Sequence, residues 1–347
     1  MANRGSDVKR VLVVGGGLIG ARHVQAVRAH PHCELVGLVD PDPKVLPHDP
    51  APRYAHMSEV SEQVDGVILA TPTDLHASQG EEAARRGWHI LVEKPVAESL
   101  PAAKRLAQAV AQAGVGSLVG HHRRYHASVQ QLKDLIGTGE IGIPITASLL
   151  WAMRKPDSYF VGNWRTQSGS PVMINLVHDI DILRFVLGEV SAVAALRGAG
   201  QRSASRIESG AIALAFDQGA TATISFADTA PSPWGFEAGT GENPNIGTTG
   251  QDMLWISGTK GAISFPSLTL WAGTDWGTPA TRRQMIRREN KKEPLDAQLD
   301  HFLDVMDGAP PLIDVADATR TLEIALQIED QLADQTTGGM HARSALA

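Results

Sequence analysis

The chain has 347 residues, a length that favours two domains over one. Hydrophobic residues make up 43% of it and charged residues 20%, which is usual for a globular protein with a sizeable core. The net charge of −7 argues against a nucleic-acid-binding surface, which needs clustered excess Lys and Arg. The single cysteine, Cys33, excludes an internal disulfide framework, and neither a signal peptide nor a membrane-spanning segment is visible. We therefore expect a cytoplasmic protein that binds neither nucleic acid nor a membrane.

Short apolar runs alternate with helical patterns through the first third of the chain. Fully apolar runs separated by helices are typical of the buried strands of a doubly wound sheet. We therefore predict a parallel, doubly wound α/β domain over residues 1–123. Its strands are expected at 11–14, 34–39, 66–70, 89–92 and 115–119, and its helices at 18–29, 75–86 and 99–113.

The pattern changes from about Ile145 onward. Short strand-like runs follow one helical pattern, and turns such as Asp217-Gln218-Gly219 suit antiparallel hairpins. We predict an α/β domain over 124–347 with an open, largely antiparallel sheet and C-terminal helices. Because an open sheet leaves one face to be covered, we expect a homodimer or homotetramer that associates through it. The expected helices are 173–187, 295–306 and 315–332, and the expected strands are 191–199, 211–216, 221–226, 253–257 and 262–265.

A glycine-rich turn follows the first predicted strand, at residues 15–20. Gly15 would permit a tight turn, Gly17 would let backbone N–H groups approach a pyrophosphate, and Gly20 would allow close helix–strand packing. Asp40 ends the next strand, where it would accept hydrogen bonds from ribose hydroxyls and repel a 2′-phosphate. The turn therefore predicts a site for NAD, in preference to NADP; a glycine-rich turn without a ligand is the alternative. The cofactor-binding residues expected here are Gly15, Gly17, Leu18, Ile19, Gly20 and Asp40.

Further cofactor contacts are expected where other strands end. Thr71 and Pro72 follow the strand predicted at 66–70, at the carboxyl edge where ligands of open α/β sheets bind. His76 begins the next helix, where it either packs or contacts the ligand.

The motif Glu93-Lys94-Pro95 follows the next predicted strand. A lysine at this edge, with its backbone restricted by a proline, suits a position beside a nicotinamide. Partial burial and nearby cofactor charge can tune its ammonium for proton transfer or for polarising a carbonyl. With this motif, the glycine-rich turn and a C-terminal pattern from His301-Phe302 to Thr321-Leu322, the chain resembles the glucose–fructose oxidoreductase / inositol dehydrogenase / rhizopine catabolism (Gfo/Idh/MocA) family.

The resemblance covers nearly the whole chain. It implies an N-terminal Rossmann domain and a C-terminal α/β domain with an open sheet. It also implies that Lys94 is the catalytic lysine and that Glu93 positions the loop on the cofactor side. A cis peptide bond is expected at Pro95.

Residues 169–181 resemble the Gly-rich turn and the helix that carry a catalytic Asp and His in this family. His178 is then the natural general acid/base for a substrate hydroxyl. Asn175 lies three residues before His178, on the same helical face, whereas the family pattern has Asp four residues before the His. Because Asn cannot act as a base, we expect it to hydrogen-bond a substrate hydroxyl or to orient His178. Either Lys94 or His178 would then accept the proton.

Histidines and arginines gather at residues 120–126, after the next predicted strand. Adjacent arginines and missing carboxylates disfavour a metal site, so we expect no metal. Arg123 could clamp a carboxylate or ring hydroxyls. Trp164 frames the pocket by the resemblance, and simple packing is the alternative. The substrate contacts implied by the resemblance are His122, Arg123, Tyr125, Trp164 and Arg165.

Together these residues predict an NAD-dependent dehydrogenase or reductase that transfers hydride between nicotinamide and a secondary hydroxyl or ketone of a polyol, sugar or cyclic diol. One alternative is a redox-neutral hydrolase or lyase of the same fold, which would cleave its substrate without accumulating NADH. The other is a non-catalytic NAD-sensing regulator, which need not keep both Lys94 and His178. The long loop at 228–249 and Arg123 suit a carboxylated cyclic diol as well as a sugar, so several substrate classes stay open.

Overall fold

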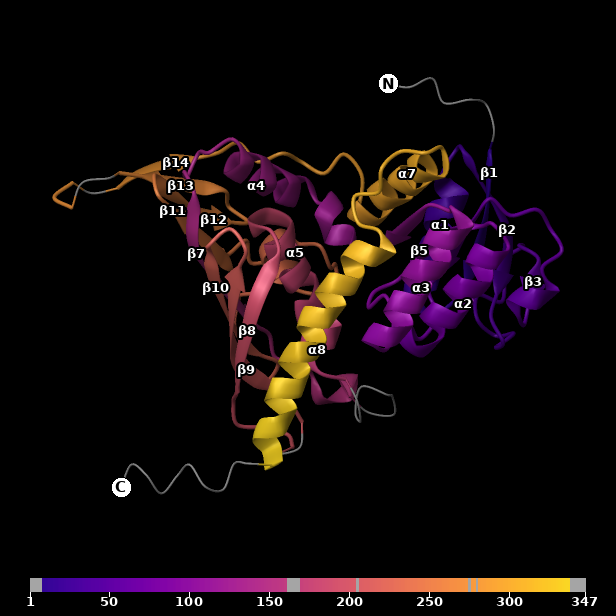
Figure 1. Cartoon of the computed structure of the whole chain (residues 1–347), viewed down its shortest axis with the longest axis horizontal. Coiled ribbons are helices and arrows are strands. Elements are labelled where there is room, and N and C mark those ends of the chain that lie inside the picture. The colour runs from indigo at the N-terminus through magenta and orange to yellow at the C-terminus, as the bar shows by residue number, and fades with distance from the viewer. Residues whose placement is uncertain (1–7, 161–168, 204–205, 274–275, 279, 338–347) are drawn as a thin grey trace. The chain divides into compact units, whose positions relative to one another are not determined.

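The computed structural model describes residues 8–160, 169–203, 206–273, 276–278 and 280–337 (Figure 1). The chain forms two compact units. Unit 1 comprises Met1–Tyr125 and Lys291–Leu322, and unit 2 comprises His126–Asn290 and Glu323–Ala347. The segment Lys291–Leu322 therefore belongs to unit 1, although it falls in the second domain expected from the sequence.

Unit 1 is built on a six-stranded sheet. Its strands are β1 (Lys9–Val14), β2 (Cys33–Val39), β3 (Arg53–Tyr54), β4 (Gly66–Leu69), β5 (His89–Val92) and β6 (Ser117–Val119). All neighbouring strands run parallel, in the order β3-β2-β1-β4-β5-β6. The predicted doubly wound sheet is confirmed, and ligands of such sheets bind at the carboxyl ends of the strands, where the strand order reverses. The helices of unit 1 are α1 (Leu18–Ala29), α2 (Thr73–Arg85), α3 (Leu100–Ala113) and α7 (Pro294–Met306).

The apolar stripe of α7 explains why the late segment joins unit 1. Leu295, Leu299 and Phe302 recur at the spacing that places side chains on one helical face. They pack in one buried cluster with side chains of the sheet and of α1, among them Val11 and Val27. The predicted helix at 295–306 is thus present, and it packs against the core of unit 1.

Unit 2 is built on an eight-stranded sheet. Its strands are β7 (Pro144–Ala152), β8 (Val190–Arg197), β9 (Ser209–Phe216), β10 (Thr221–Ala227), β11 (Leu254–Gly258), β12 (Gly261–Phe265), β13 (Thr269–Ala272) and β14 (Thr281–Gln284). The order is β14-β13-β12-β11-β7-β10-β9-β8, with β7 and β10 parallel and the other neighbouring pairs antiparallel. The predicted largely antiparallel sheet is confirmed, whereas β7, β13 and β14 were not predicted. The helices are α4 (Ala127–Gly137), α5 (Val177–Leu187), α6 (Phe236–Thr240) and the end of α8 (Val315–Thr337).

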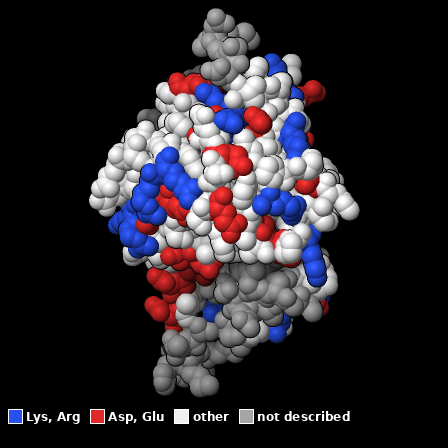
Figure 2. Space-filling view, turned by 90° about the vertical axis from the view of Figure 1, so that its right-hand side faces the viewer, with Lys and Arg blue, Asp and Glu red and all other residues white. Residues whose placement is uncertain are grey.

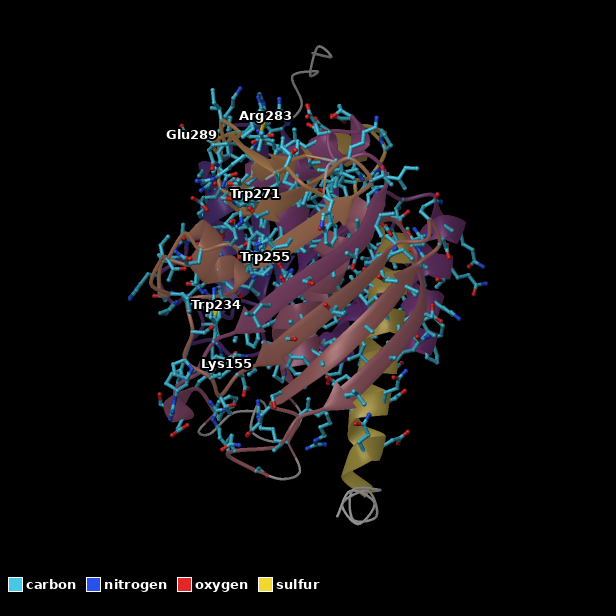
Figure 3. All side chains as sticks on the ribbon, turned by 90° about the vertical axis from the view of Figure 1, so that its left-hand side faces the viewer. Lys155, Trp234, Trp255, Trp271, Arg283 and Glu289 are labelled. Carbon is cyan, nitrogen blue, oxygen red and sulfur yellow. The ribbon has the colours of Figure 1, made fainter. Side chains whose placement is uncertain are left out.

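The two faces of this sheet differ in burial. On β7, Leu149 and Trp151 are buried, and Figure 1 shows α5 on that side of the sheet. Ser148 points to the opposite face, because neighbouring residues of a strand alternate. The strand register pairs Ser148 with Trp255 of β11, so Trp255 lies on the same face. Trp255 and Trp271 are each 40% exposed on this face, which Figure 3 presents to the viewer.

Three further features bear on the expected partners and redox chemistry. Within the described part of the chain, no helix has the length and apolar character needed to cross a membrane. On the face shown in Figure 2, Lys and Arg lie among Asp and Glu. Burial raises the pKa of the half-buried Cys33 thiol to about 12, so this thiol stays protonated at neutral pH.

Candidate active site

The glycine-rich turn joins β1 to α1, and its steric properties match the roles predicted for it. Gly15 has a φ of +86°, and a Cβ there would lie 2.6 Å from the carbonyl oxygen of Ala70. A Cβ on Gly20 would lie 1.9 Å from the carbonyl oxygen of Gly15, so α1 approaches the turn more closely than any side chain permits. A Cβ on Gly17 would meet no atom within 4 Å, so the turn is open at this position.

The N-terminus of α1 has features that suit a phosphate. Its N-cap residue, Gly17, has no side chain to accept hydrogen bonds from the first turn, which also holds no acidic residue. Such a terminus carries partial positive charge on its N–H groups. Leu18 is 90% exposed, whereas Ile19 packs against the core of unit 1. The turn therefore fits the pyrophosphate of a dinucleotide.

Asp40 is held beside this turn. One carboxylate oxygen accepts a hydrogen bond from the N–H of Gly16 at 2.8 Å, and the other accepts one from the N–H of Asp42 at 2.9 Å. These bonds fix the carboxylate, and its remaining lone pairs can accept hydrogen bonds from ribose hydroxyls.

His76 of α2 ties two loops of the carboxyl edge together. Its buried ring has Nε2 at 2.9 Å from the carbonyl oxygen of Thr71 and Nδ1 at 2.8 Å from that of Pro95. Burial lowers the pKa of His76, and the two carbonyl contacts oppose burial without overcoming it. Both ring nitrogens therefore make structural contacts with backbone carbonyl oxygens. The Thr71 hydroxyl donates to Gln79 at 2.6 Å, and the exposed Pro72 is the N-cap of α2.

Glu93 is buried directly after β5 and stays ionised. Its Oε1 lies 2.8 Å from Nε2 of His23 on α1, and its Oε2 accepts a hydrogen bond from the N–H of Lys94 at 3.2 Å. Burial disfavours the charged carboxylate, but the hydrogen bond with His23 and the surrounding positive charges outweigh it and lower the pKa of Glu93 to about 2. A Cβ on Gly120 would lie 2.6 Å from Oε2. Glu93 therefore fixes the loop of Lys94 relative to α1.

The lysine loop and the end of the adjacent strand lie at one edge of the sheet. Lys94 is half-buried after β5, and its peptide bond to Pro95 is cis, as predicted. Strand β6 pairs with β5 and leads into a short 3-10 helix at His122–Tyr125. His122 is half-buried there, and Arg123 is 3% exposed.

The next two residues anchor this segment within unit 1. Arg124 donates a hydrogen bond to the carboxylate of Asp317 at 2.9 Å. The Tyr125 hydroxyl lies 2.8 Å from Nδ1 of His301, one of the residues of the C-terminal pattern. Tyr125 therefore has a structural contact in addition to the substrate contact expected from the sequence.

In unit 2, the helix of His178 begins with an unexpected π-helical turn at Val172–Leu176. The sequence predicts a continuous α-helix here, because a π turn has no periodic signature of its own. Single π turns are rare and occur frequently at functional sites. His178 is 6% exposed at the start of α5, and Asn175 lies half-buried within the π turn.

Two side chains that the sequence did not single out hold Asn175. Its Oδ1 accepts a hydrogen bond from Nζ of Lys155 at 2.6 Å, and its Nδ2 donates to the carboxylate of Glu237 at 3.4 Å. A signal for Lys155 was present, since, like Lys94, it precedes a proline shortly after a strand end. Glu237 lies in the loop expected at 228–249 and carries no such signal.

Trp164 and Arg165 lie outside the described residues. No group of three or more His, Cys, Asp or Glu side chains that could hold a metal ion occurs in the described ranges.

Two models of one protein family match this sequence. The model described as an oxidoreductase family with an NAD-binding Rossmann fold matches residues 9–121, and the model of the Gfo/Idh/MocA C-terminal domain matches residues 129–264. The chain belongs to the Gfo/Idh/MocA family. The resemblance seen in the lysine motif is thus confirmed, and unit 1 carries the NAD-binding Rossmann fold of this family.

Individual relatives agree with this assignment. The protein named uncharacterized oxidoreductase YrbE of Bacillus subtilis is 30% identical over 61% of this chain and 65% of its own length. The scyllo-inositol 2-dehydrogenase (NAD(+)) of the same organism is 28% identical over 76% of this chain and 74% of its own length. An oxidoreductase from Agrobacterium radiobacter, solved with NAD+, L-tartaric acid and magnesium, superposes with a TM-score of 0.79 over 94% of this chain and 97% of its own. At 19% identity, that structure supports the Gfo/Idh/MocA fold alone.

Proposed function

We propose that this Gfo/Idh/MocA protein is an NAD-dependent dehydrogenase or reductase that acts on a secondary hydroxyl or ketone of a polyol, sugar or cyclic diol. The observation that carries the proposal is Lys94, a half-buried lysine at the ligand edge of the Rossmann sheet, in a loop fixed by the buried charge of Glu93. The name of the relative scyllo-inositol 2-dehydrogenase supports a polyol.

The cofactor is proposed to be NAD, in preference to NADP. When bound, it supplies the acceptor or donor of the hydride. The turn at Gly17 and the first N–H groups of α1 would hold the pyrophosphate. Asp40 would accept hydrogen bonds from the ribose and repel a 2′-phosphate. The further cofactor contacts proposed from the sequence are Thr71, Pro72, His76 and Glu93.

Lys94 and His178 are proposed to handle the proton. The ammonium of Lys94 would donate a hydrogen bond to the substrate oxygen and stabilise the negative charge that develops on it. Either His178 or Lys94 would accept the hydroxyl proton. The substrate contacts proposed from the sequence are His122, Arg123, Tyr125, Trp164 and Arg165.

We further propose that the protein is a homo-oligomer that associates through the exposed face of the unit 2 sheet. Trp255 and Trp271 expose large apolar rings on this face (Figure 3). Around them the same face carries small side chains such as Ser148 and Thr223, which leave it flat enough for another surface to approach. Exposed apolar rings on a flat face are typical of association surfaces.

The test is a panel of polyols, sugars and cyclic diols incubated with NAD and followed by NADH absorbance. We expect at least one of them to be oxidised, and Lys94→Ala to lower turnover by about 100-fold or more while NAD binding persists. Turnover within a few-fold of wild type would remove Lys94 from the proposed mechanism. Substrate cleavage without NADH formation would instead favour the redox-neutral alternative, and NAD binding with no turnover of any compound would favour the regulator.

A further inference from the structure

Lys155 of unit 2 has no role in the proposed mechanism, although hydrogen bonds link it to Asn175 and, through Asn175, to Glu237. It follows the end of β7 (Figure 3), and its Nζ donates a hydrogen bond to Oδ1 of Asn175 at 2.6 Å. The amide of Asn175 is oriented in turn by Glu237, to which Nδ2 donates at 3.4 Å. Glu237 is 7% exposed, so this chain of contacts leads from a buried carboxylate to a half-buried ammonium.

The backbone of Lys155 is held as firmly as its side chain. Its N–H donates to the carbonyl oxygen of Asp228 at 3.0 Å. Its carbonyl oxygen accepts from the guanidinium of Arg202 at 2.8 Å, and Arg202 also binds the carboxylate of Asp228 at 2.7 Å. A lysine fixed at its main chain and at its ammonium is pre-organised, so a ligand that binds it need order little more.

Two aromatic rings border the ammonium. The Nζ of Lys155 lies 5.4 Å from the ring centroid of Trp151 and 5.1 Å from that of Tyr159, distances at which a cation is attracted to an aromatic face. Trp151 is fully buried, and its Nε1 has no hydrogen-bond partner among the described residues. The two rings therefore help to hold the ammonium where Asn175 accepts its hydrogen bond.

We propose that Lys155 is a specificity-determining residue that binds a carboxylate group of the substrate, with Asn175 and Glu237 as positioning residues. An ammonium forms its strongest hydrogen bonds with anionic oxygens. The negative charge of the nearby Glu237 favours a singly charged carboxylate over a phosphate dianion. This inference rests on the proposed function, and it narrows the substrate class to hydroxy acids derived from polyols, sugars or cyclic diols.

Lys133 shows how a purely structural lysine of the same unit differs. Its Nζ donates to the carbonyl oxygen of Phe185 at 3.0 Å and lies 3.7 Å from the centroid of that ring. Phe185 is in the last turn of α5, where a cation can donate a hydrogen bond to a terminal carbonyl oxygen and interacts favourably with the helix dipole. Lys133 therefore has a complete structural explanation, and Lys133→Met is the matched control for loss of a lysine from unit 2.

The experiment measures binding to the full chain in the presence of NAD by calorimetry, so it does not require turnover. Three pairs of an acid and a neutral partner serve as probes: D-glucuronate with D-glucose, D-gluconate with D-glucitol, and quinate with myo-inositol. D-glucose 6-phosphate separates a phosphate from a carboxylate. The proteins are wild type, Lys155→Met, Lys155→Arg, Asn175→Ala and Lys133→Met.

We expect wild type to bind at least one acid more tightly than its neutral partner. Lys155→Met should weaken that acid by about ten- to a hundredfold, the range for removing one charged hydrogen bond. Lys155→Arg should keep most of the preference because it keeps the charge, Asn175→Ala should lose part of it, and Lys133→Met should match wild type.

The inference is overturned if no acid binds more tightly than its neutral partner, if Lys155→Met weakens acid and neutral partner alike, or if the phosphate binds more tightly than every carboxylate. Parallel NADH assays separate it from the proposed function. Binding of an acid through Lys155 without oxidation of any compound would refute the dehydrogenase but keep the carboxylate site. Oxidation of neutral polyols together with an acid preference that Lys155→Met leaves unchanged would refute the carboxylate site alone.

Discussion

Glu93→Gln tests the buried charge that supports the Lys94 loop. The substitution keeps the size and shape of the side chain and removes its negative charge. Folding lowers the pKa of Glu93 from 4.5 to about 2, because the hydrogen bond with His23 and the surrounding positive charges outweigh the cost of burial. At about 1.4 kcal/mol for each unit of pKa shift, the ionised carboxylate contributes about 3 kcal/mol to the free energy of unfolding at neutral pH.

The pH dependence follows from the sign of this change. Because the pKa of Glu93 is lower in the folded protein, its contribution is complete above about pH 4.5 and is lost as the pH falls toward about 2. Wild type should therefore lose this stability in acid, whereas the Gln variant has none of it to lose. The stability gap between the two proteins is about 3 kcal/mol at pH 7 and shrinks to less than half of that at pH 3.

Urea unfolding at pH 7, 5 and 3 measures this gap directly. Glu98→Gln is the control, since Glu98 is an exposed carboxylate of the same loop. A gap below about 1 kcal/mol at pH 7, or one that stays constant from pH 7 to pH 3, would refute the reasoning. A small gap at pH 7 would mean that the charge of Glu93 contributes little to stability. A constant gap would mean that the Gln variant loses stability through packing alone.

The remaining predictions concern the cofactor turn and the exposed sheet. Gly20→Ala should destabilise the protein by more than about 2 kcal/mol in urea unfolding, because its Cβ would lie 1.9 Å from a backbone oxygen. Gly17→Ala should unfold like wild type but bind NAD more weakly in calorimetry, since its Cβ enters open space where the pyrophosphate is proposed to bind; equal NAD affinity would contradict that placement. Asp40→Ala should raise the use of NADP relative to NAD in steady-state assays, and an unchanged ratio would refute the proposed role. Trp255→Glu should shift sedimentation toward smaller species, whereas the control Trp276→Glu, at a fully exposed position, should not; a wild type that sediments as a monomer would refute the oligomer.

Much of unit 1 could be predicted because its signals are local. The strands are short apolar runs. Helix α3 is capped at its start by Ser99, which accepts a hydrogen bond from the N–H of Ala102, and at its end by Gly114 in a left-handed conformation. The glycine-rich turn is only partly local, since a Cβ on Gly20 would meet the carbonyl oxygen of Gly15, whereas a Cβ on Gly15 would meet that of Ala70, which follows β4. Periodicity also predicted α7. It could not predict which core α7 joins, because an apolar stripe indicates that one face of a helix is buried but does not indicate which residues that face contacts.

The parts of the candidate site that escaped prediction depend on distant partners. His23 looks like any helical histidine until the fold brings it to Glu93, 70 residues away in sequence. Strand β7 was missed because the apolar Leu150 interrupts the alternation of its buried residues Ala147, Leu149 and Trp151 in the sequence. Lys155 was missed together with β7, because its role depends on its place after that strand and on its hydrogen bond to Asn175.

The contacts of Asn175 give a physical reason for an amide, and not a carboxylate, at this position. Its Nδ2 donates to Glu237, and its Oδ1 accepts from Lys155, so the two ends of one amide serve a carboxylate and an ammonium. An aspartate at this position would offer no donor to Glu237 and would place two negative charges side by side in a poorly hydrated site, which raises the free energy of both. The amide therefore follows from the neighbouring charges. In this chain the π turn presents Asn175 to Lys155, which leaves proton transfer to Lys94 and His178 in the proposed mechanism.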